Sequence, residues 1–251
     1  MCKFIKRYIY PYFVDAASIA SIIGLIAAFC SQQYAVIIAL ITFCVVLLLM
    51  LIGVFVAINK FIKSNHNDAY KKVSSFYIYR SDDGIKSTFE TYRLIQCKRP
   101  ILSEIEYKYK WSGTKLPKLT SDKQIVEQLP PNNDPNIWDK AIIKFPTPLS
   151  YNESTVLHIR TENDDYDKKA KPWIECCLSS PIEIMQFRVL LAYKAKNYSK
   201  KAFLKRRKLG AEVGVDYDII ETVDFDSKYK QYNHIVLNPE PGYSYRLEWE
   251  K

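Results

Sequence analysis

The sequence predicts an N-terminal hairpin of two transmembrane helices joined to an all-β cytosolic domain, built as an antiparallel sandwich or small barrel. No Asp, Glu, Lys or Arg occurs between Ala16 and Asn59, whereas the rest of the 251-residue chain is charged and rich in tyrosine. Several segments of that second part alternate between apolar and polar residues, as half-buried strands do. We therefore predict a hairpin at residues 1–63, a linker at 64–74 and a β-rich domain at 75–251.

Two apolar segments, divided by a short polar turn, form the predicted hairpin. The turn is Ser31, Gln32 and Gln33. A bilayer core of about 30 Å requires about 20 helical residues, and the second segment, 34–58, is long enough to cross it. The first uncharged segment, 16–30, is shorter, so its helix either begins earlier or spans a thinned bilayer. We expect helices at about 10–30 and 34–58, and the second span argues against a cleaved signal peptide.

Basic residues flank the pair of apolar segments and are absent from the turn between them. They are Lys3, Lys6 and Arg7 before the pair, and Lys60, Lys63, Lys71 and Lys72 after it. Lysine and arginine concentrate on the cytoplasmic side of membrane proteins. The pattern therefore predicts a multi-pass protein with both termini in the cytoplasm.

Small residues recur at every fourth position in both apolar segments. They are Ala16, Ala20, Gly24 and Ala28 in the first segment, and Gly53 and Ala57 in the second. Small residues let helix backbones approach closely in lipid, where this contact drives association. The two faces either pack the helices of one hairpin together or pack several chains into a homo-oligomer.

Asp15 is the ionisable residue nearest the first apolar segment. It follows Pro11 by about one turn, where a helix start is expected and a negative charge meets the positive end of the helix dipole. An intramembrane carboxylate is also a functional candidate by default. Asp15 therefore lies either at the membrane interface or at a polar contact inside a pore or oligomer.

The clearest strands are the alternating segments "EIEYKYKW" at 104–111 and "YSYRLEWEK" at 243–251. Each is predicted to have one apolar and one wet face. Further strands are expected at residues 75–80, 89–96, 137–145, 155–161, 173–178, 183–193, 217–223 and 232–237, between turns rich in Pro, Asn and Gly. A short helix is expected around 122–129. Many short strands without alternating helices favour a sandwich or small barrel.

A basic segment at 194–210 departs from the strand pattern. It contains eight Lys or Arg residues between Lys194 and Lys208 and no acidic residue. Ser199 as N-cap and Gly210 as helix stop predict a short helix at 200–209. The candidate contact residues are Lys200, Lys201, Lys205, Arg206, Arg207 and Lys208. Three interpretations remain open: a solvated face, a nucleic-acid phosphate contact, and a contact with an anionic membrane leaflet.

The sequence contains no catalytic or metal-binding pattern. The three histidines, His66, His158 and His234, are scattered, and none of the seven glycines belongs to a phosphate-binding loop. The acidic run "TENDDYDKK" at 161–169 is expected to be an exposed hairpin tip, and the alternative is a loop that binds a divalent cation. The adjacent Cys176 and Cys177 would point to opposite faces of a strand. We expect a protein that is not an enzyme and has no catalytic residues, no metal and no cofactor.

This architecture resembles the membrane effectors of bacterial anti-phage systems: two membrane helices, at 16–30 and 34–58, followed by strands from about Ser75 to Trp249. It is most similar to the two-transmembrane accessory protein of a retron. The alternative is the two-transmembrane β-barrel effector of CBASS systems, which senses a cyclic oligonucleotide. The soluble part is large for that barrel, which favours the retron type. The resemblance lies in the architecture, so it assigns no functional residues.

The resemblance implies a protein of the bacterial inner membrane that acts in antiviral defence by abortive infection. A reverse transcriptase with its multicopy single-stranded DNA (msDNA) would hold it silent. Once released, it would damage the membrane and kill the infected cell. The competing class is a non-toxic membrane-anchored binding module.

Overall fold

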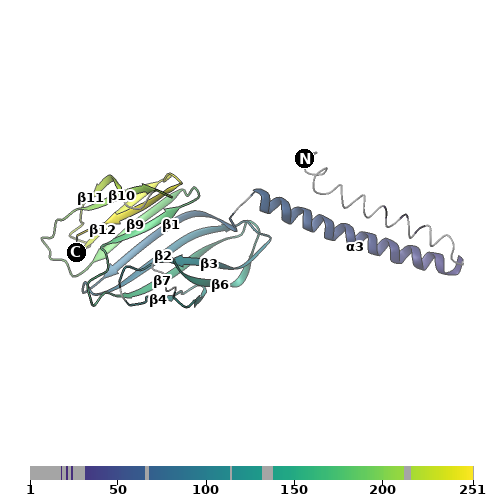
Figure 1. Ribbon diagram of the computed structural model, residues 1–251, viewed down its shortest axis with the longest axis horizontal. Helices are drawn as coiled ribbons and strands as arrows, with labels where there is room; N and C mark the ends of the chain where they lie inside the picture. Colours follow the sequence, from purple (N-terminus) through teal and green to yellow (C-terminus); the bar gives the residue numbers. More distant parts are fainter. Residues whose placement is uncertain are drawn as a thin grey trace. The chain divides into compact units, whose positions relative to one another are not determined.

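The structure is a computed structural model that describes Ser18, Ser21, Gly24 and residues 32–65, 68–113, 115–131, 138–211 and 216–250. The chain divides into two compact units, Met1–Asp68 and Ala69–Lys251. The first contains one long helix, α3, and the second contains the strands, here called the β domain (Figure 1).

Helix α3 (Gln32–Asn65) is long and apolar enough to cross a membrane. Its apolar segment, Val36–Ile62, has 27 residues and a mean hydropathy of 3.2. At 1.5 Å per residue this segment is about 40 Å long, so it can span a bilayer core with some tilt. The helix extends beyond the predicted 34–58 at both ends. Gln32 and Gln33 of the expected turn are helical, and lysines, which favour helices, continue it past Ile58.

Most of the predicted first helix lies outside the described residues. Ser18, Ser21 and Gly24 have α-helical backbone. The positions of Asp15, Ala16, Ala20 and Ala28 also lie outside the described part of the chain. The structure thus supports one long apolar helix, and the two-helix hairpin stays a prediction.

The described residues of the β domain form three sheets. The strands are β1 (Tyr70–Ser81), β2 (Lys86–Cys97), β3 (Ile101–Tyr109), β4 (Lys118–Thr120), β5 (Ile125–Gln128), β6 (Asp139–Ser150), β7 (Ser154–Asp164), β8 (Trp173–Leu178), β9 (Ile184–Leu191), β10 (Ala202–Lys208), β11 (Asp218–Val223), β12 (Gln231–Leu237) and β13 (Tyr243–Glu248). The strand orders are β12-β9-β1-β2-β7-β4, β11-β10-β13-β8 and β3-β6-β5. The predicted all-β domain is confirmed.

One pair of strands corrects the prediction of a purely antiparallel domain. β1 and β9 run parallel, with Tyr77 opposite Phe187. A two-residue hairpin can join only antiparallel strands, and parallel neighbours need a longer connection. Here the chain forms β2 to β8 before β9 returns between β1 and β12.

Two hydrophobic cores lie on the same face of the six-stranded sheet. The first core, which includes Tyr77 and Leu247, joins it to the four-stranded sheet. The second core, which includes Ile95 and Ile143, joins it to the three-stranded sheet. Phe89 packs against the first core and lies six residues before Ile95 on β2, so the two side chains point to one face. The two small sheets therefore cover different parts of the same face of the six-stranded sheet.

The two alternating segments form strands as predicted. In β3 the side chains of Ile105, Tyr107 and Tyr109 are buried, whereas those of Glu104 and Glu106 are exposed. In and after β13, Tyr245, Leu247 and Trp249 are buried in the first core. The alternation of apolar and polar residues is therefore enough to predict both strands and the face that each strand buries.

The local predictions for residues 122–129 and 64–74 were wrong. The helix expected around 122–129 is instead strand β5, which pairs with β6. Its β-branched Ile125 and Val126 favour a strand, and the Ser121 hydroxyl accepts the N–H groups of Lys123 and Gln124 to form a turn before it. The linker expected at 64–74 is also shorter, because α3 continues to Asn65 and β1 begins at Tyr70.

Candidate functional site

Helix α3 has one stripe of side chains that are less exposed than their neighbours. The stripe consists of Ile38, Thr42, Val46, Met50, Gly53 and Ala57. Steps of three and four residues place these positions on one side of the helix. The Thr42 hydroxyl donates to the Ile38 carbonyl at 2.7 Å, so this polar group is satisfied within the helix, as lipid requires. Gly53 and Ala57, the predicted packing residues, are the two buried members.

The rest of α3 carries large exposed apolar side chains. They include Val36, Leu40, Phe43, Leu47, Leu51 and Phe55. Only 6% of the most apolar stretch of this helix is buried. Water would solvate such a surface at a large cost, whereas lipid tails are as apolar as these side chains. The helix is therefore suited to a bilayer.

The basic segment is a strand and not the predicted helix. Residues Ala202–Lys208 form β10, which pairs with β11 on one side and β13 on the other. Ala202 and Leu204 are buried in the first core, two residues apart, and this alternation outweighs the helix caps suggested by Ser199 and Gly210.

Most of the candidate basic side chains on this segment are paired with carboxylates. The pairs are Lys200–Glu250 at 3.4 Å, Lys201–Asp224 at 3.3 Å, Lys205–Glu248 at 3.0 Å and Arg206–Glu240 at 3.1 Å. The Arg207 guanidinium lies 4.6 Å from the Tyr217 ring centroid, and Lys208 is exposed. The Lys205–Glu248 pair is partly buried and the other three are more exposed. Exposed pairs add little stability, but all four pairs reduce the positive potential that a nucleic acid would meet.

The acidic run at 161–169 is less exposed than predicted. Strand β7 continues through Asp164, and Thr161, Asn163 and Asp165 are buried. The Asp165 carboxylate accepts the Ala170 N–H at 2.7 Å and thereby closes the following turn. Among the described residues no group of histidine, cysteine or acidic side chains is arranged to hold a metal ion.

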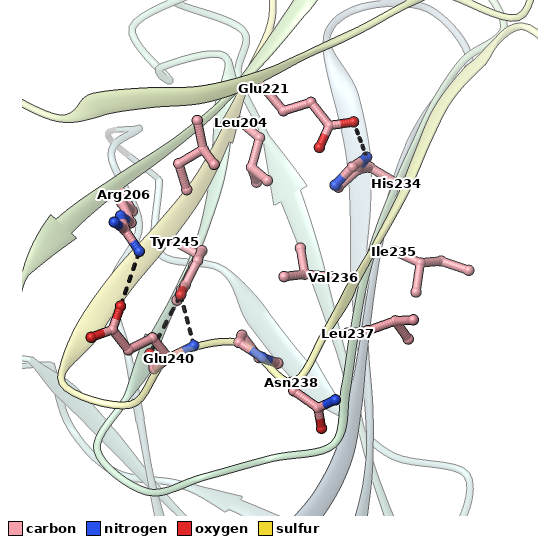
Figure 2. A pocket seen from close by; sticks show the side chains of 12 residues that line it. Leu204, Arg206, Glu221, His234, Ile235, Val236, Leu237, Asn238, Glu240 and Tyr245 are labelled. Atoms are coloured by element: carbon pink, nitrogen blue, oxygen red, sulfur yellow. Dashed lines mark hydrogen bonds and ion pairs between the residues drawn. The ribbon is translucent and has the colours of Figure 1, made fainter.

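A groove of about 370 Å³ opens between β12 and the four-stranded sheet. Leu204, Arg206 and Tyr245 line it from β10 and β13, and His234 and Val236 line it from β12 (Figure 2). The connection from β12 to β13 closes one end.

Polar contacts fix the rim of this groove. The Tyr245 hydroxyl accepts the Glu240 N–H at 2.9 Å, and the Glu240 carboxylate pairs with Arg206 (Figure 2). On the other side, His234 Nδ1 lies 3.5 Å from Glu221 Oε1 of β11. These contacts tie β12 and the connection after it to the strands of the four-stranded sheet.

Strand β12 presents a free backbone edge beside the groove. The Leu191 N–H donates to the Lys230 carbonyl, and the Asn238 N–H donates to the Glu183 carbonyl. In an antiparallel ladder with these two bonds, the backbone N–H and C=O groups of the even-numbered residues of β12 point toward β9. The backbone N–H and C=O groups of Ile235 therefore point away from β9. Within the described residues, β9 is the only strand that pairs with β12.

Apolar side chains surround this free edge. Ile235 is 50% exposed and Leu237 is 68% exposed, while Ile219 and Ile220 of β11 are 61% and 44% exposed. An unpaired strand edge next to exposed isoleucines is a ready site for another chain. The sequence pattern of β11 and β12 predicts strands but gives no sign of this groove, because residues 204, 221, 234 and 245 meet only in the folded domain.

The histidines and adjacent cysteines named from the sequence form no metal-binding group among the described residues. His158 is buried, stacks on Tyr92 with ring centroids 4.4 Å apart, and accepts the Asp122 N–H at 3.2 Å. Cys176 is buried and Cys177 is exposed, in agreement with their expected opposite directions. His66 lies outside the described residues.

Comparisons with known proteins identify no relative in sequence. No protein-family model matches the chain, and no curated protein matches it. Among solved structures, the chain is similar to an M1 zinc metallopeptidase from Deinococcus radiodurans, with a TM-score of 0.39 and 10% identity over 72% of this chain and 42% of that chain. It is also similar to a putative protease from Parabacteroides distasonis ATCC 8503, with a TM-score of 0.41 and 7% identity over 71% and 40% of the two chains. This chain spans less than half the length of those proteins, and no activity is inferred from them.

Proposed function

We propose that the protein is a membrane effector of a bacterial anti-phage defence system of the retron type, acting by abortive infection. The observation that carries the proposal is α3, whose 27-residue apolar segment is mostly exposed and has one less exposed stripe that includes Gly53 and Ala57. This combination suits a helix that inserts in the inner membrane and packs against other helices there.

In this proposal the β domain is the regulatory part. A reverse transcriptase with its msDNA holds the protein silent by binding at the groove, where the free edge of β12 and the exposed Ile219, Ile235 and Leu237 provide backbone and apolar contacts. Release of this partner during infection allows the N-terminal unit to disrupt the membrane.

Expression of the full chain alone in bacteria tests the proposal. We expect dye entry and loss of membrane potential soon after induction, because no partner restrains the protein. Co-expression of the cognate reverse transcriptase and its noncoding RNA should restore growth. Normal membrane potential at high levels of membrane-inserted protein would instead indicate a non-toxic anchored module.

A second candidate is a CBASS-type effector gated by a cyclic oligonucleotide. The groove favours it, since Arg206, His234 and Tyr245 supply cationic and aromatic groups around a volume of about 370 Å³. In that case, membrane damage should require a cyclic oligonucleotide and should not respond to a reverse transcriptase.

A further inference from the structure

Strand β12 forms one edge of the six-stranded sheet, and part of this edge is regular and unpaired. The register with β9 runs from Gln231 to Leu237 without a bulge. On the side away from β9, Gln231 exchanges both backbone hydrogen bonds with Asp226, at 3.1 and 2.8 Å. The odd-numbered residues of β12 therefore direct their backbone groups outward. Within the described part of the chain, those of Asn233, Ile235 and Leu237 have no backbone partner.

Both ends of this free run are closed. Asp226 occupies the outward side at Gln231. Asn238 has a φ of 47°, so the chain leaves the extended conformation after Leu237. The free run is thus Asn233 to Leu237, and a symmetric pairing along it has to centre on Ile235.

The free edge of β12 carries no charge. No Asp, Glu, Lys or Arg occurs between Gln231 and Pro239. Among the described strands, every other edge of the three sheets includes at least one of these residues; these edges are β3, β4, β5, β8 and β11. Charged side chains, prolines and bulges usually protect an edge against another strand. The free run of β12 has none of these protections.

An uncharged edge suits pairing with an identical edge. Two copies bring equal charges together, so a charged edge strand repels its own copy. A different partner would gain from complementary charges, and the free run of β12 offers none. The edge therefore fits a second copy of this chain better than an unrelated acidic or basic strand.

The exposed side chains beside the edge match in a two-fold arrangement. Tyr232 and Val236 pack in or against the first core. Ile235 and Leu237 point away from the groove and are 50% and 68% exposed (Figure 2). With Ile235 opposite its own copy, Asn233 lies opposite Leu237 of the second copy, and each pair exchanges backbone hydrogen bonds. The two Ile235 side chains then meet, and each lies diagonally beside Leu237 of the other copy.

We propose that β12 pairs antiparallel with β12 of a second copy of this chain, which joins two six-stranded sheets into one continuous sheet. Two copies anchored by α3 in one bilayer would have a raised effective concentration, which favours so short a contact. The pairing uses contacts of the β domain alone and does not rest on the proposed effector function. The partner named in that proposal would cover the same edge, so the pairing is measured without that partner.

Disulfide crosslinking in membranes that contain the full chain tests the pairing. In a hydrogen-bonded antiparallel pair the Cα atoms are about 5.5 Å apart, within the range that a disulfide bridges. Ile235→Cys should therefore form a reducible covalent dimer under mild oxidation, above the background of the native cysteines in the unmodified chain. Ile184→Cys is the matched control, since Ile184 is 37% exposed on the same face but lies one strand further in, on β9. About 14 Å or more would separate it from its copy, so it should give no dimer above the background.

A proline variant tests whether backbone pairing forms the contact. Asn233→Cys and Leu237→Cys in one chain lie opposite each other across the two copies, and adding Ile235→Pro should reduce their dimer at least about tenfold. Proline removes only the outward N–H and leaves the ladder with β9 intact, so the Tm should stay close to that of the control Ile235→Val. The valine variant should keep the dimer.

Three outcomes would overturn the proposal. They are the absence of a dimer from Ile235→Cys, equal dimer yields in the proline and valine variants, and a disulfide from position 235 to a different protein in place of its own copy.

Discussion

Replacing Trp249 by alanine is expected to destabilise the β domain by about 3–5 kcal/mol, as measured by denaturant unfolding of the full chain in detergent. Trp249 is 5% exposed in the first core, and its ring centroid lies 5.0 Å from that of Tyr79. Alanine leaves a large cavity between the six-stranded and four-stranded sheets. Domains have stabilities of about 5–15 kcal/mol, so this variant should lose much of its folding free energy.

The matched control is Trp138→Ala, because Trp138 is 44% exposed. It should change the free energy of unfolding by no more than about 0.5 kcal/mol. Removing residues 249–251 should act like Trp249→Ala and also break the bond from the Trp249 N–H to the Pro172 carbonyl. Equal stability of the two tryptophan variants would show that the Trp249 side chain does not contribute to the core.

Under the proposed function, replacing Gly53 and Ala57 together by leucine is expected to abolish membrane damage when the chain is expressed alone. Both positions lie on the less exposed stripe of α3, and Ala57 is 1% exposed. Leucine there prevents close approach of a second helix, and overpacking of about 1–3 kcal/mol weakens association about tenfold or more. The fraction of dye-positive cells, counted at matched protein levels in the membrane fraction, measures the effect.

Val54→Leu is the control for this pair. Val54 adjoins Gly53 but is 36% exposed on another side of the helix, so a larger apolar side chain there should be tolerated. Undiminished dye entry with the double leucine variant would show that membrane damage does not depend on helix packing along this stripe.

Periodicity explains which elements can be predicted from the sequence. In β3, each inward residue from Ile105 to Tyr109 is apolar and each outward residue is charged, so one local pattern fixes the strand and its face. For β10, local signals conflict, because helix caps flank a segment in which only Ala202 and Leu204 reach the core. The pairing of β10 with β11 and β13 decides the outcome, and that pairing joins distant parts of the chain.

The candidate sites depend even more on distant contacts. The free edge of β12 cannot be predicted from residues 231–237, because only the folded domain decides that β9 pairs with one side of this strand and that no described strand pairs with the other. The carboxylates that neutralise Lys205 and Arg206 are Glu248 and Glu240, which are far away in the sequence. Counting the charges along the basic segment at 194–210 therefore overestimates the positive potential around it.

The late return of β9 beside β1 has a consequence for the order of events during synthesis. α3 is complete at Asn65, whereas β9 begins at Ile184 and the groove also needs β12 and β13. At translation rates of about 5–20 residues per second, roughly 10–40 seconds separate the completion of α3 from the finished groove. A partner that binds the groove cannot restrain a nascent chain in that interval. Under the proposed function, a newly made α3 must therefore be harmless by itself. Membrane damage must then require the association of completed chains.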